Sequence, residues 1–302
     1  MKKIYSSKWK IALFMAPALI LFVGILVAPI FMSAYYSFFN FKGFGAKTFV
    51  GLDNYKELFT SERLRFWKAL GNCCLLAVLS VFIQLPISLF FALVLGKGRK
   101  GERGFLSIFF MPVLISTIVI GQLWLKIYNP EYGILNTALR ALGLESWTRI
   151  WLGDPKTALI AAFIPTVWQF VGYHMLLLYA GVKSVPTEYR EAAMIDGASE
   201  AKVNRYIVLP YIKPILRIST IFAVTGSFKS FDLIYVLMGG EPGNNPAVVP
   251  TILLINQGFD GGRYGMGSAI ALLLIILCFA AAILINAIFR DRETVSKKRK
   301  RG

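Results

Sequence analysis

Six long apolar runs alternate with polar segments along this 302-residue chain. A helix needs about 20 mostly apolar residues to cross a bilayer, and every run meets that length. We therefore expect an all-α membrane protein with six transmembrane helices. They cover residues 11–38, 69–95, 105–127, 158–182, 215–238 and 266–289. Prolines inside the runs would kink these helices and free backbone carbonyls for neighbouring helices, which favours packing around a cavity.

A polar segment, residues 186–210, separates the fourth run from the fifth. Pro186 suits the first turn of a helix, which we expect over residues 188–195. Gly197 permits the positive φ of a sharp reversal, and Ser199 can cap a second short helix after it. The segment therefore predicts a bent helical protrusion outside the lipid.

The middle of this protrusion has a surface that suits contact with another protein. Ala192 and Ala193 carry almost no side-chain bulk, so a partner can approach the backbone closely there. Glu191 would offer an acceptor to an arginine or a backbone amide of that partner. An amphipathic helix that rests on lipid headgroups fits the same pattern. The pattern alone leaves both interpretations open.

The distribution of charge predicts the orientation of the chain. Residues are 56% apolar and 16% charged, and the net charge is +17. Lys and Arg concentrate in both tails and in the loops at residues 97–103 and 183–217. The positive-inside rule makes these segments cytoplasmic, so both termini lie inside (N-in/C-in). Basic groups placed beside membrane runs indicate contact with lipid headgroups and not with nucleic acid.

The sequence contains no pattern typical of a metal or catalytic site. Cys73, Cys74 and Cys278 all lie in apolar runs, where we expect them to act as small packing residues. The single histidine, His174, cannot build a multi-histidine metal site, and we expect a neutral imidazole bonded to a neighbouring helix. A membrane-embedded enzyme would need a converging nucleophile, base or metal set, so we expect a non-catalytic protein.

Polar residues in the fourth and fifth runs are the candidates for lining a cavity, and the family resemblance given below implies that they form a substrate pathway. Thr225, Lys229 and Asp232 have the i, i+4, i+7 spacing of one helix face. A charge within a span costs roughly 2.5–3.5 kcal/mol on insertion scales, so the two charged residues should face water or pair with each other. A purely structural ion pair is an equal alternative. The full candidate set is Gln169, Tyr173, Thr225, Lys229, Asp232 and Tyr235.

The protrusion carries the signature of a known family. Its residues are Glu191-Ala192-Ala193, then Gly197, then Ile207-x-Leu209-Pro210. This spacing resembles the EAA loop of inner-membrane permeases in binding-protein-dependent ABC importers. Further matches resemble the carbohydrate-uptake branch, which includes the maltose transporter permeases, and the resemblance runs from about residue 17 to 289. These matches lie at residues 50–55, 129–133, 168–169, 195–198, 226–235 and 239–243.

The resemblance implies a type I ABC importer permease fold with cytoplasmic EAA coupling helices. It implies a second, usually different, permease subunit, two ATPase subunits and an extracytoplasmic sugar-binding protein, in a prokaryotic plasma (inner) membrane. The chain has no GxxxxGK[ST] phosphate loop, so ATP and Mg would be bound by the ATPase subunits and this chain would hold no cofactor. The residues expected to dock on the ATPase are Glu191, Ala192, Ala193, Asp196 and Gly197.

The same resemblance suggests four consecutive parts. They are a cytoplasmic N-tail (1–10), a first helix with an external loop (11–67), a five-helix core (68–289) that includes the docking loop 183–210, and a basic cytoplasmic tail (290–302).

The resemblance favours an oligosaccharide or glycoside as the cargo. A polyol or a glycerol phosphate ester is an alternative, since related permeases carry them. An ion-coupled secondary transporter would show inverted repeats and mid-membrane carboxylates, whereas these runs hold only Asp232.

Overall fold

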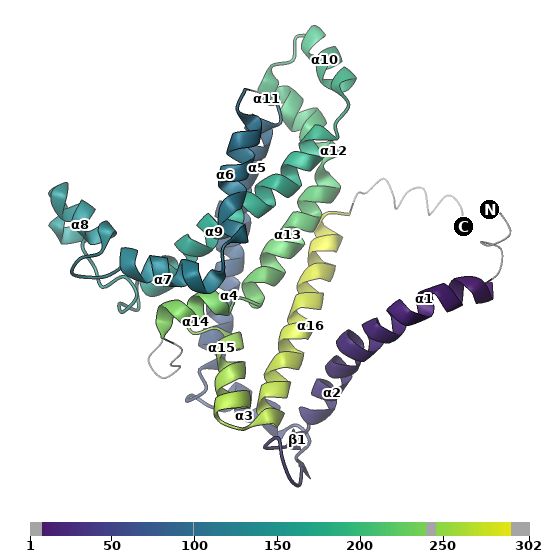
Figure 1. The fold of residues 1–302 in the computed structure, drawn as a ribbon, viewed down its shortest axis with the longest axis vertical. Coiled ribbons are helices and arrows are strands. Elements are labelled where there is room, and N and C mark those ends of the chain that lie inside the picture. Colours follow the sequence, from purple (N-terminus) through teal and green to yellow (C-terminus); the bar gives the residue numbers. More distant parts are fainter. Residues whose placement is uncertain (1–7, 99, 240–245, 291–302) are drawn as a thin grey trace. The chain divides into compact units, whose positions relative to one another are not determined.

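The computed structural model describes residues 8–98, 100–239 and 246–290, and these ranges are mostly helical (Figure 1). Five helices are long and apolar enough to cross a membrane, and a bent helix pair supplies a sixth if it counts as one span. The five are Ile11–Tyr36, Phe66–Leu95, Ala158–Lys183, Lys213–Met238 and Tyr264–Ile288. The predicted all-α class is confirmed, while the N-in/C-in orientation stays a prediction.

Short helical segments make up these spans and the loops between them. Two π-helical turns, Val23–Val27 and Ser80–Gln84, join α1 to α2 and α4 to α5. The segments of the first three spans are α1 (Lys8–Phe22), α2 (Ala28–Tyr36), α4 (Phe66–Leu79), α5 (Leu85–Leu95), α6 (Glu102–Leu114) and α7 (Thr117–Ile127). The later spans contain α9 (Ala158–Lys183), α13 (Lys213–Phe228), α14 (Asp232–Met238) and α16 (Tyr264–Ile288).

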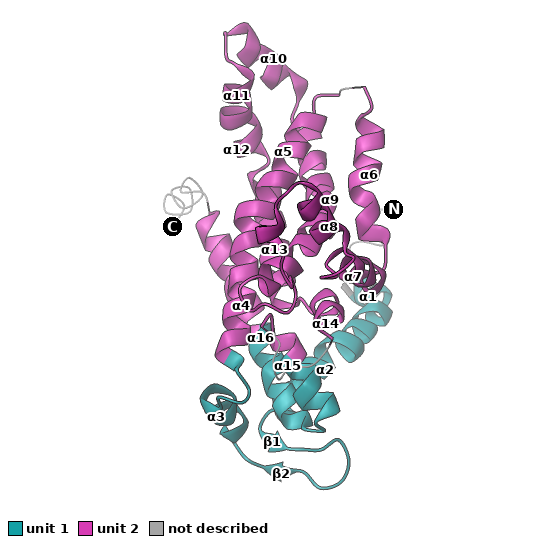
Figure 2. Ribbon diagram, turned by 90° about the vertical axis from the view of Figure 1, so that its left-hand side faces the viewer, with its two compact units in different colours: residues 1–66, 253–275 teal, residues 67–252, 276–302 magenta. Residues whose placement is uncertain are grey.

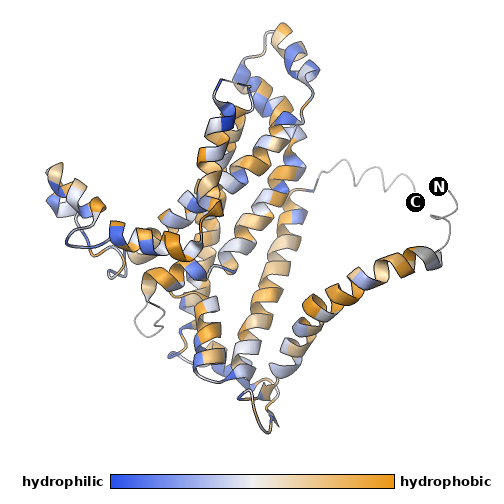
Figure 3. Ribbon diagram, in the orientation of Figure 1, coloured by the Kyte–Doolittle hydropathy of each residue, from blue (hydrophilic) through white to orange (hydrophobic). Residues whose placement is uncertain are grey.

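The segments outside the spans are short. They are α3 (Asp53–Thr60), α8 (Ile134–Ala141), α10 (Thr187–Ile195), α11 (Glu200–Val203), α12 (Leu209–Tyr211) and α15 (Pro250–Ile255). Figure 3 shows that the spans are mainly hydrophobic and that the segment around α10 and α11 is more hydrophilic. The expected tails, residues 1–10 and 290–302, and the turn 239–243 lie mostly outside the described residues.

The third predicted span is not one continuous helix. The sequence predicts a helix over 105–127, but α6 and α7 meet at an angle of 95°. Pro112 has no N–H to donate and weakens the last turn of α6. The β-branched Ile115 and the following Ser116 then adopt extended backbone angles, which ends the helix. The apolar run in the sequence does not by itself indicate such a break.

The described chain divides into two compact units (Figure 2). The first contains residues 1–66 and 253–275, and the second contains residues 67–252 and 276–302. In the first unit, strands β1 (Phe39–Asn40) and β2 (Thr48–Phe49) form an antiparallel pair.

Asn54 lies in the first turn of α3, in the first unit, and holds the preceding loop in place by hydrogen bonds. Its amide nitrogen donates to the carbonyl oxygens of Ser37 (2.8 Å) and Phe39 (3.0 Å). Glu57, one turn further along, forms an ion pair with Arg263, which lies just before α16. The motif 50–55 therefore has a structural role in this unit, because it fixes the chain that leaves α2.

In the second unit, α9 packs against both α5 and α6. A side chain at Gly172 would place its Cβ 1.9 Å from the Phe109 carbonyl oxygen of α6, so only glycine allows this approach. Towards the other end of α9, Leu178 and Val182 belong to a buried cluster with Ala92 of α5. These contacts make α5, α6 and α9 the frame of the unit.

Candidate functional site: a cavity and a protruding loop

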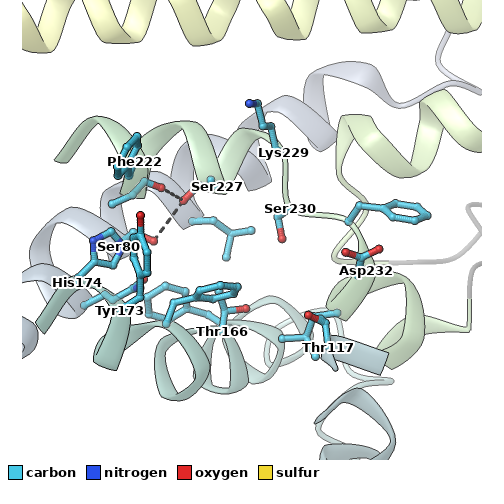
Figure 4. Close-up of a pocket in the computed structure, with 18 of the residues that line it drawn as sticks. Ser80, Thr117, Thr166, Tyr173, His174, Phe222, Ser227, Lys229, Ser230 and Asp232 are labelled. Atoms are coloured by element: carbon cyan, nitrogen blue, oxygen red, sulfur yellow. Dashed lines mark hydrogen bonds between the residues drawn. The ribbon is translucent and has the colours of Figure 1, made fainter. Parts of the chain in front are cut away.

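A cavity of about 390 Å³ lies inside the second unit. Four segments enclose it: the α4–α5 span, the α6–α7 break, the middle of α9 and the α13–α14 break (Figure 4). Six hydroxyl side chains line it: Ser80, Thr117, Thr166, Tyr173, Ser227 and Ser230. Four phenylalanines also line it: Phe163, Phe170, Phe222 and Phe231. Hydroxyls both donate and accept hydrogen bonds and rings offer flat apolar contact, so the wall suits a ligand with both kinds of surface.

Two interrupted helices bring polar groups into this wall. α6 and α7 contribute Val113 and Thr117 from either side of their break. α13 ends at Phe228 and α14 begins at Asp232, so residues 229–231 face the cavity from a non-helical segment. A helix break at membrane depth is tolerated where the backbone finds other partners or lines a polar cavity.

Buried hydrogen bonds hold the wall together. The His174 Nδ1 lies 2.8 Å from the Ser219 Oγ, which joins α9 to α13. The Ser80 and Ser227 hydroxyl oxygens lie 3.2 Å apart and join the second span to α13. The predicted bond of His174 to a neighbouring helix is confirmed, and its ring also lines the cavity.

The predicted pathway residues divide into two groups. Tyr173, Lys229 and Asp232 line the cavity. Thr225 does not, and its hydroxyl donates to the Ile221 carbonyl within α13 (2.7 Å). Tyr235 does not either: it packs on Phe231, with 5.0 Å between ring centroids. Their roles stay predictions.

Gln169 is buried beside the cavity and does not belong to its lining. Its amide nitrogen donates to the Thr117 hydroxyl at 3.2 Å, which ties α9 to the first residue of α7. Its amide oxygen is buried without a hydrogen-bond partner in the part of the chain that the structure describes. Gln169 therefore contacts the cavity wall through Thr117, and its role in the pathway stays a prediction.

The expected helix face of Thr225, Lys229 and Asp232 is wrong. It assumed a continuous helix, whereas the chain leaves helical geometry between Lys229 and Asp232. The alternative of a structural ion pair is wrong too, since these two side chains form none within the described ranges and point to different sides in Figure 4. Both charges instead lie along the same cavity.

Sequence reasoning missed several residues of the wall. Ser80, Gln84, Thr117 and Ser227 lie within apolar runs and still contribute polar groups to the cavity. They could have been recognised as candidates from the sequence, because a polar side chain inside an apolar run usually faces the bundle interior. Which of the many such residues converge could be learned only from the positions of the helix breaks.

The predicted protrusion forms as a bent helical pair. α10 covers Thr187–Ile195, Gly197 has a φ of +77°, and α11 starts after Ser199. The side chain at Glu191 is exposed, as expected for a contact surface. Figure 1 places α10 at one end of its unit, and a shallow groove runs between α10 and the chain that follows α11.

The groove contains the small residues that the sequence singled out. Ala192, Ala193 and Asp196 line one side of it, and Tyr189 adds an aromatic ring. Pro210, the last residue of the signature, belongs to the opposite side. Apart from Ala193, which is half-buried, the expected docking residues, including Gly197, are exposed in this chain.

The base of the protrusion is fastened to the membrane helices. An Arg190 guanidinium nitrogen donates to the Val182 carbonyl of α9 at 2.5 Å. Glu200 of α11 pairs with Lys97, just beyond α5, at 2.5 Å. Val203, Val208 and Ile212 belong to the buried cluster that also contains Ala92, Leu178, Val182 and Val185. The protrusion therefore shares a hydrophobic core with α5 and α9.

No group of three or more His, Cys, Asp or Glu side chains within residues 8–98, 100–239 and 246–290 could hold a metal ion. The side chains that line the cavity offer hydroxyls, aromatic rings, the Gln84 amide, one imidazole and two opposite charges.

Comparison with known sequences identifies the family. Residues 84–293 match the family described as binding-protein-dependent transport system inner membrane component. The chain belongs to this family. The matched region of the permease includes the protrusion and most of the cavity wall.

Individual relatives agree with this assignment. The permease is 37% identical to the probable ABC transporter permease protein YurN of Bacillus subtilis, over 92% of this chain and 95% of that one. It is 35% identical to the trehalose/maltose transport system permease protein MalF of Thermococcus litoralis, over 82% of each chain.

A solved structure shares the fold of the permease. It belongs to a bacterial ABC transporter that imports the acidic polysaccharide alginate, and the superposition has a TM-score of 0.80 at 23% identity. The match covers 96% of this chain and 97% of that one. A second crystal structure of the alginate transporter holds a periplasmic protein with bound alginate pentasaccharide.

Proposed function

We propose that this chain is the membrane-spanning subunit of an ATP-driven importer whose cavity passes an oligosaccharide or glycoside. The cavity wall carries this proposal. It combines six hydroxyls with four phenylalanine rings. A sugar presents hydroxyls at its edge and apolar C–H groups on its ring faces, so both kinds of wall have a counterpart in it. A volume of about 390 Å³ falls within the usual range of small-molecule sites, roughly 300–1,000 Å³.

Relatives support the same cargo class. One 35% identical relative is named for trehalose and maltose transport, and the alginate importer shares the fold. Alginate is acidic, whereas the cavity in this chain carries one positive and one negative side chain, Lys229 and Asp232. A neutral sugar therefore fits this wall better than a polyanion.

The protrusion supports the proposed partners. It offers an exposed groove with small residues at Ala192 and Ala193, and its base shares a core with α5 and α9. We assign this surface to a cleft of an ATPase subunit, which would bind ATP and Mg, while this chain binds no cofactor. A second permease subunit and an extracytoplasmic sugar-binding protein complete the assembly. The N-in/C-in orientation, which the charge distribution favours, puts the protrusion on the ATPase side of the prokaryotic plasma membrane.

One observation favours the alternative cargo, a glycerol phosphate ester. Lys229 lines the cavity and forms no ion pair within the described ranges, so it is able to meet a phosphate. The carboxylate of Asp232 at the same cavity opposes an anion, which makes this the second candidate.

Uptake by the reconstituted transporter tests the proposal. Vesicles that contain the permease with its co-purified partners are loaded with ATP and given radiolabelled maltose or trehalose, with glycerol 3-phosphate as competitor. We expect ATP-dependent sugar uptake that survives collapse of the proton gradient. Uptake that needs the proton gradient and not ATP would instead establish a secondary transporter. Strong competition by glycerol 3-phosphate would favour the phosphate ester.

A matched pair of variants links the cargo to the cavity. Ser230→Ala removes a hydroxyl from the wall, whereas Ser146→Ala removes one from the exposed 3-10 turn Glu145–Trp147 outside it. We expect the first to raise the sugar concentration needed for half-maximal uptake and the second to leave it unchanged. Equal behaviour of the two variants would remove Ser230 from the pathway.

A further inference from the structure

The segment between α7 and α9 is built around one buried amide. Asn136 of α8 donates to the carbonyl oxygens of Pro130 (3.1 Å) and Arg149 (3.0 Å). Its side-chain oxygen accepts from the Trp151 indole N–H at 2.8 Å and the Arg149 backbone N–H at 3.4 Å. All the hydrogen-bonding positions of this amide are thus used, and they fix the rotation of α8 about its axis.

This rotation turns the apolar side of α8 outward. With about 100° between successive residues, Ile134, Ala138 and Leu142 fall on one side, and Asn136 and Arg140 fall on the other. The polar side faces its own protein: Arg140 donates to the carbonyl oxygens of Glu131 (2.8 Å) and Pro130 (2.9 Å). The apolar side is not covered by the rest of the chain, since Ile134 is 71% exposed and Leu142 is 74% exposed.

A large apolar side chain in the turn that follows α8 is also exposed. Trp147, in the turn Glu145–Trp147 that contacts α8, is 64% exposed. A helix that buries its amide and exposes its isoleucine has the reverse of the pattern expected in water, where apolar surface is unfavourable. Something apolar must therefore cover this face, which we call the α8 apolar face (Ile134, Ala138 and Leu142).

We infer that the α8 apolar face lies in the interfacial layer of the membrane. The segment is tied to apolar helices at both ends: α7 ends at Ile127, and α9, a candidate span, begins at Ala158. The residues between them therefore stay near one membrane boundary. An amphipathic helix with an Arg on its polar face and a Trp in the adjoining turn is typical of a segment lying about 5–10 Å into the headgroup region.

The charges of this segment decide what kind of lipid it requires. Residues 128–157 contain three basic and three acidic side chains. The basic ones are Arg140, Arg149 and Lys156, and the acidic ones are Glu131, Glu145 and Asp154. Insertion is therefore driven by apolar contact and not by attraction to anionic headgroups. The segment anchors the α6–α7 arm to the bilayer surface, whichever substrate the cavity carries.

Lipid-depth quenching tests this inference. The full chain, assembled with its partners in nanodiscs, receives a single fluorescent cysteine at Leu142 or, as the matched control, at Thr137. Thr137 is also exposed and lies about 140° away around the same helix. The native cysteines, Cys73, Cys74 and Cys278, are replaced by alanine. Spin-labelled lipids and aqueous iodide then act as quenchers.

We expect the probe at Leu142 to lose fluorescence to lipids labelled near the headgroup, and the probe at Thr137 to lose it mainly to iodide. Exchange of zwitterionic for anionic lipid should leave both results unchanged. Quenching of both sites by iodide alone overturns the inference, because the face would then be in water. Protection of Leu142 from both quenchers also overturns it, since a protein subunit would then cover the face. None of these outcomes depends on sugar transport.

Discussion

Gly172 is the position where the packing of the cavity frame can be tested most directly. A Cβ there would lie 1.9 Å from the Phe109 carbonyl oxygen, whereas real Cβ contacts almost never fall below 3.0 Å. Gly172→Ala therefore forces α9 and α6 apart by about an ångström or more. Overpacking of this kind costs roughly 1–3 kcal/mol. The obstacle is a backbone atom, so no neighbouring side chain can give way.

The expected effect is a loss of both stability and uptake. Each kcal/mol corresponds to a decrease of about 2–4 °C in melting temperature for a mid-sized domain, so we expect a decrease of at least about 2 °C by tryptophan fluorescence. The α9 residues near Gly172 that line the cavity, Tyr173 and His174, move with the helix, so uptake should fall as well.

Two variants control this experiment. Gly104→Ala on α6 meets nothing within 4 Å, and it should leave stability unchanged or raise it by up to about 1 kcal/mol, because alanine favours a helix. Phe109→Ala combined with Gly172→Ala should not restore stability, because the clash is with the backbone. Full rescue by Phe109→Ala, or an unchanged melting temperature in Gly172→Ala, would refute the reasoning.

Three further perturbations have defined outcomes. Arg190→Met removes the hydrogen bond between α10 and the end of α9, worth about 1.5–3 kcal/mol for a charged donor, so hydrogen exchange in α10 should rise and uptake should fall while ATP hydrolysis continues. Glu57→Gln removes the pair with Arg263, whose hydrogen bond lowers the pKa of Glu57 below its ordinary value of 4.5. Above pH 4.5, this exposed pair should add about 0.2–1 kcal/mol to the free energy of unfolding. The contribution should disappear as the pH falls through the pKa of Glu57 in the folded protein, so variant and parent should have the same melting temperature in acid. Gln169→Leu removes the bond to Thr117 and should impair uptake without reducing the amount of protein in the membrane.

Each of these perturbations has its own control and contrary result. Arg205→Met alters an exposed arginine on the same protrusion and should leave exchange in α10 unchanged. A Glu57→Gln protein that differs from its parent equally at all pH values would show that Arg263 does not set the titration. Normal uptake kinetics in Gln169→Leu would separate that residue from the cavity.

Much of the helical architecture follows from the apolar runs, because only a helix satisfies its backbone within lipid. The protrusion was also predictable, since Pro186, Gly197 and Ser199 each have a local conformational reason for their places. The break between Leu114 and Thr117 was not. Pro112 is as compatible with a kink as with a right-angle bend, and the neighbouring helices decide between them.

The candidate site was predictable only in part for the same reason. Lys229 and Asp232 can be identified from the sequence as charged residues in an apolar run. The direction in which their side chains point depends on whether the helix continues between them. Ser80 and Thr117 look like minor polar residues until two helix breaks bring them to one wall. The outward apolar side of α8 depends on the bonds of Asn136, which join residues up to 15 positions apart in the sequence.

Because α9 shares a hydrophobic core with the protrusion, this one helix connects the protrusion to the cavity. At the end of α9 that the predicted orientation places near the cytoplasm, Leu178 and Val182 pack with Val203 and Val208. Phe163 lies 20 residues before Lys183, the last residue of α9, and lines the cavity. Those 20 residues span about 30 Å of helix. A tilt of only about 10° at the protrusion would then displace the wall at the far end by roughly 5 Å, about one helical turn. A small rotation at one end is therefore enough to reshape the chamber at the other.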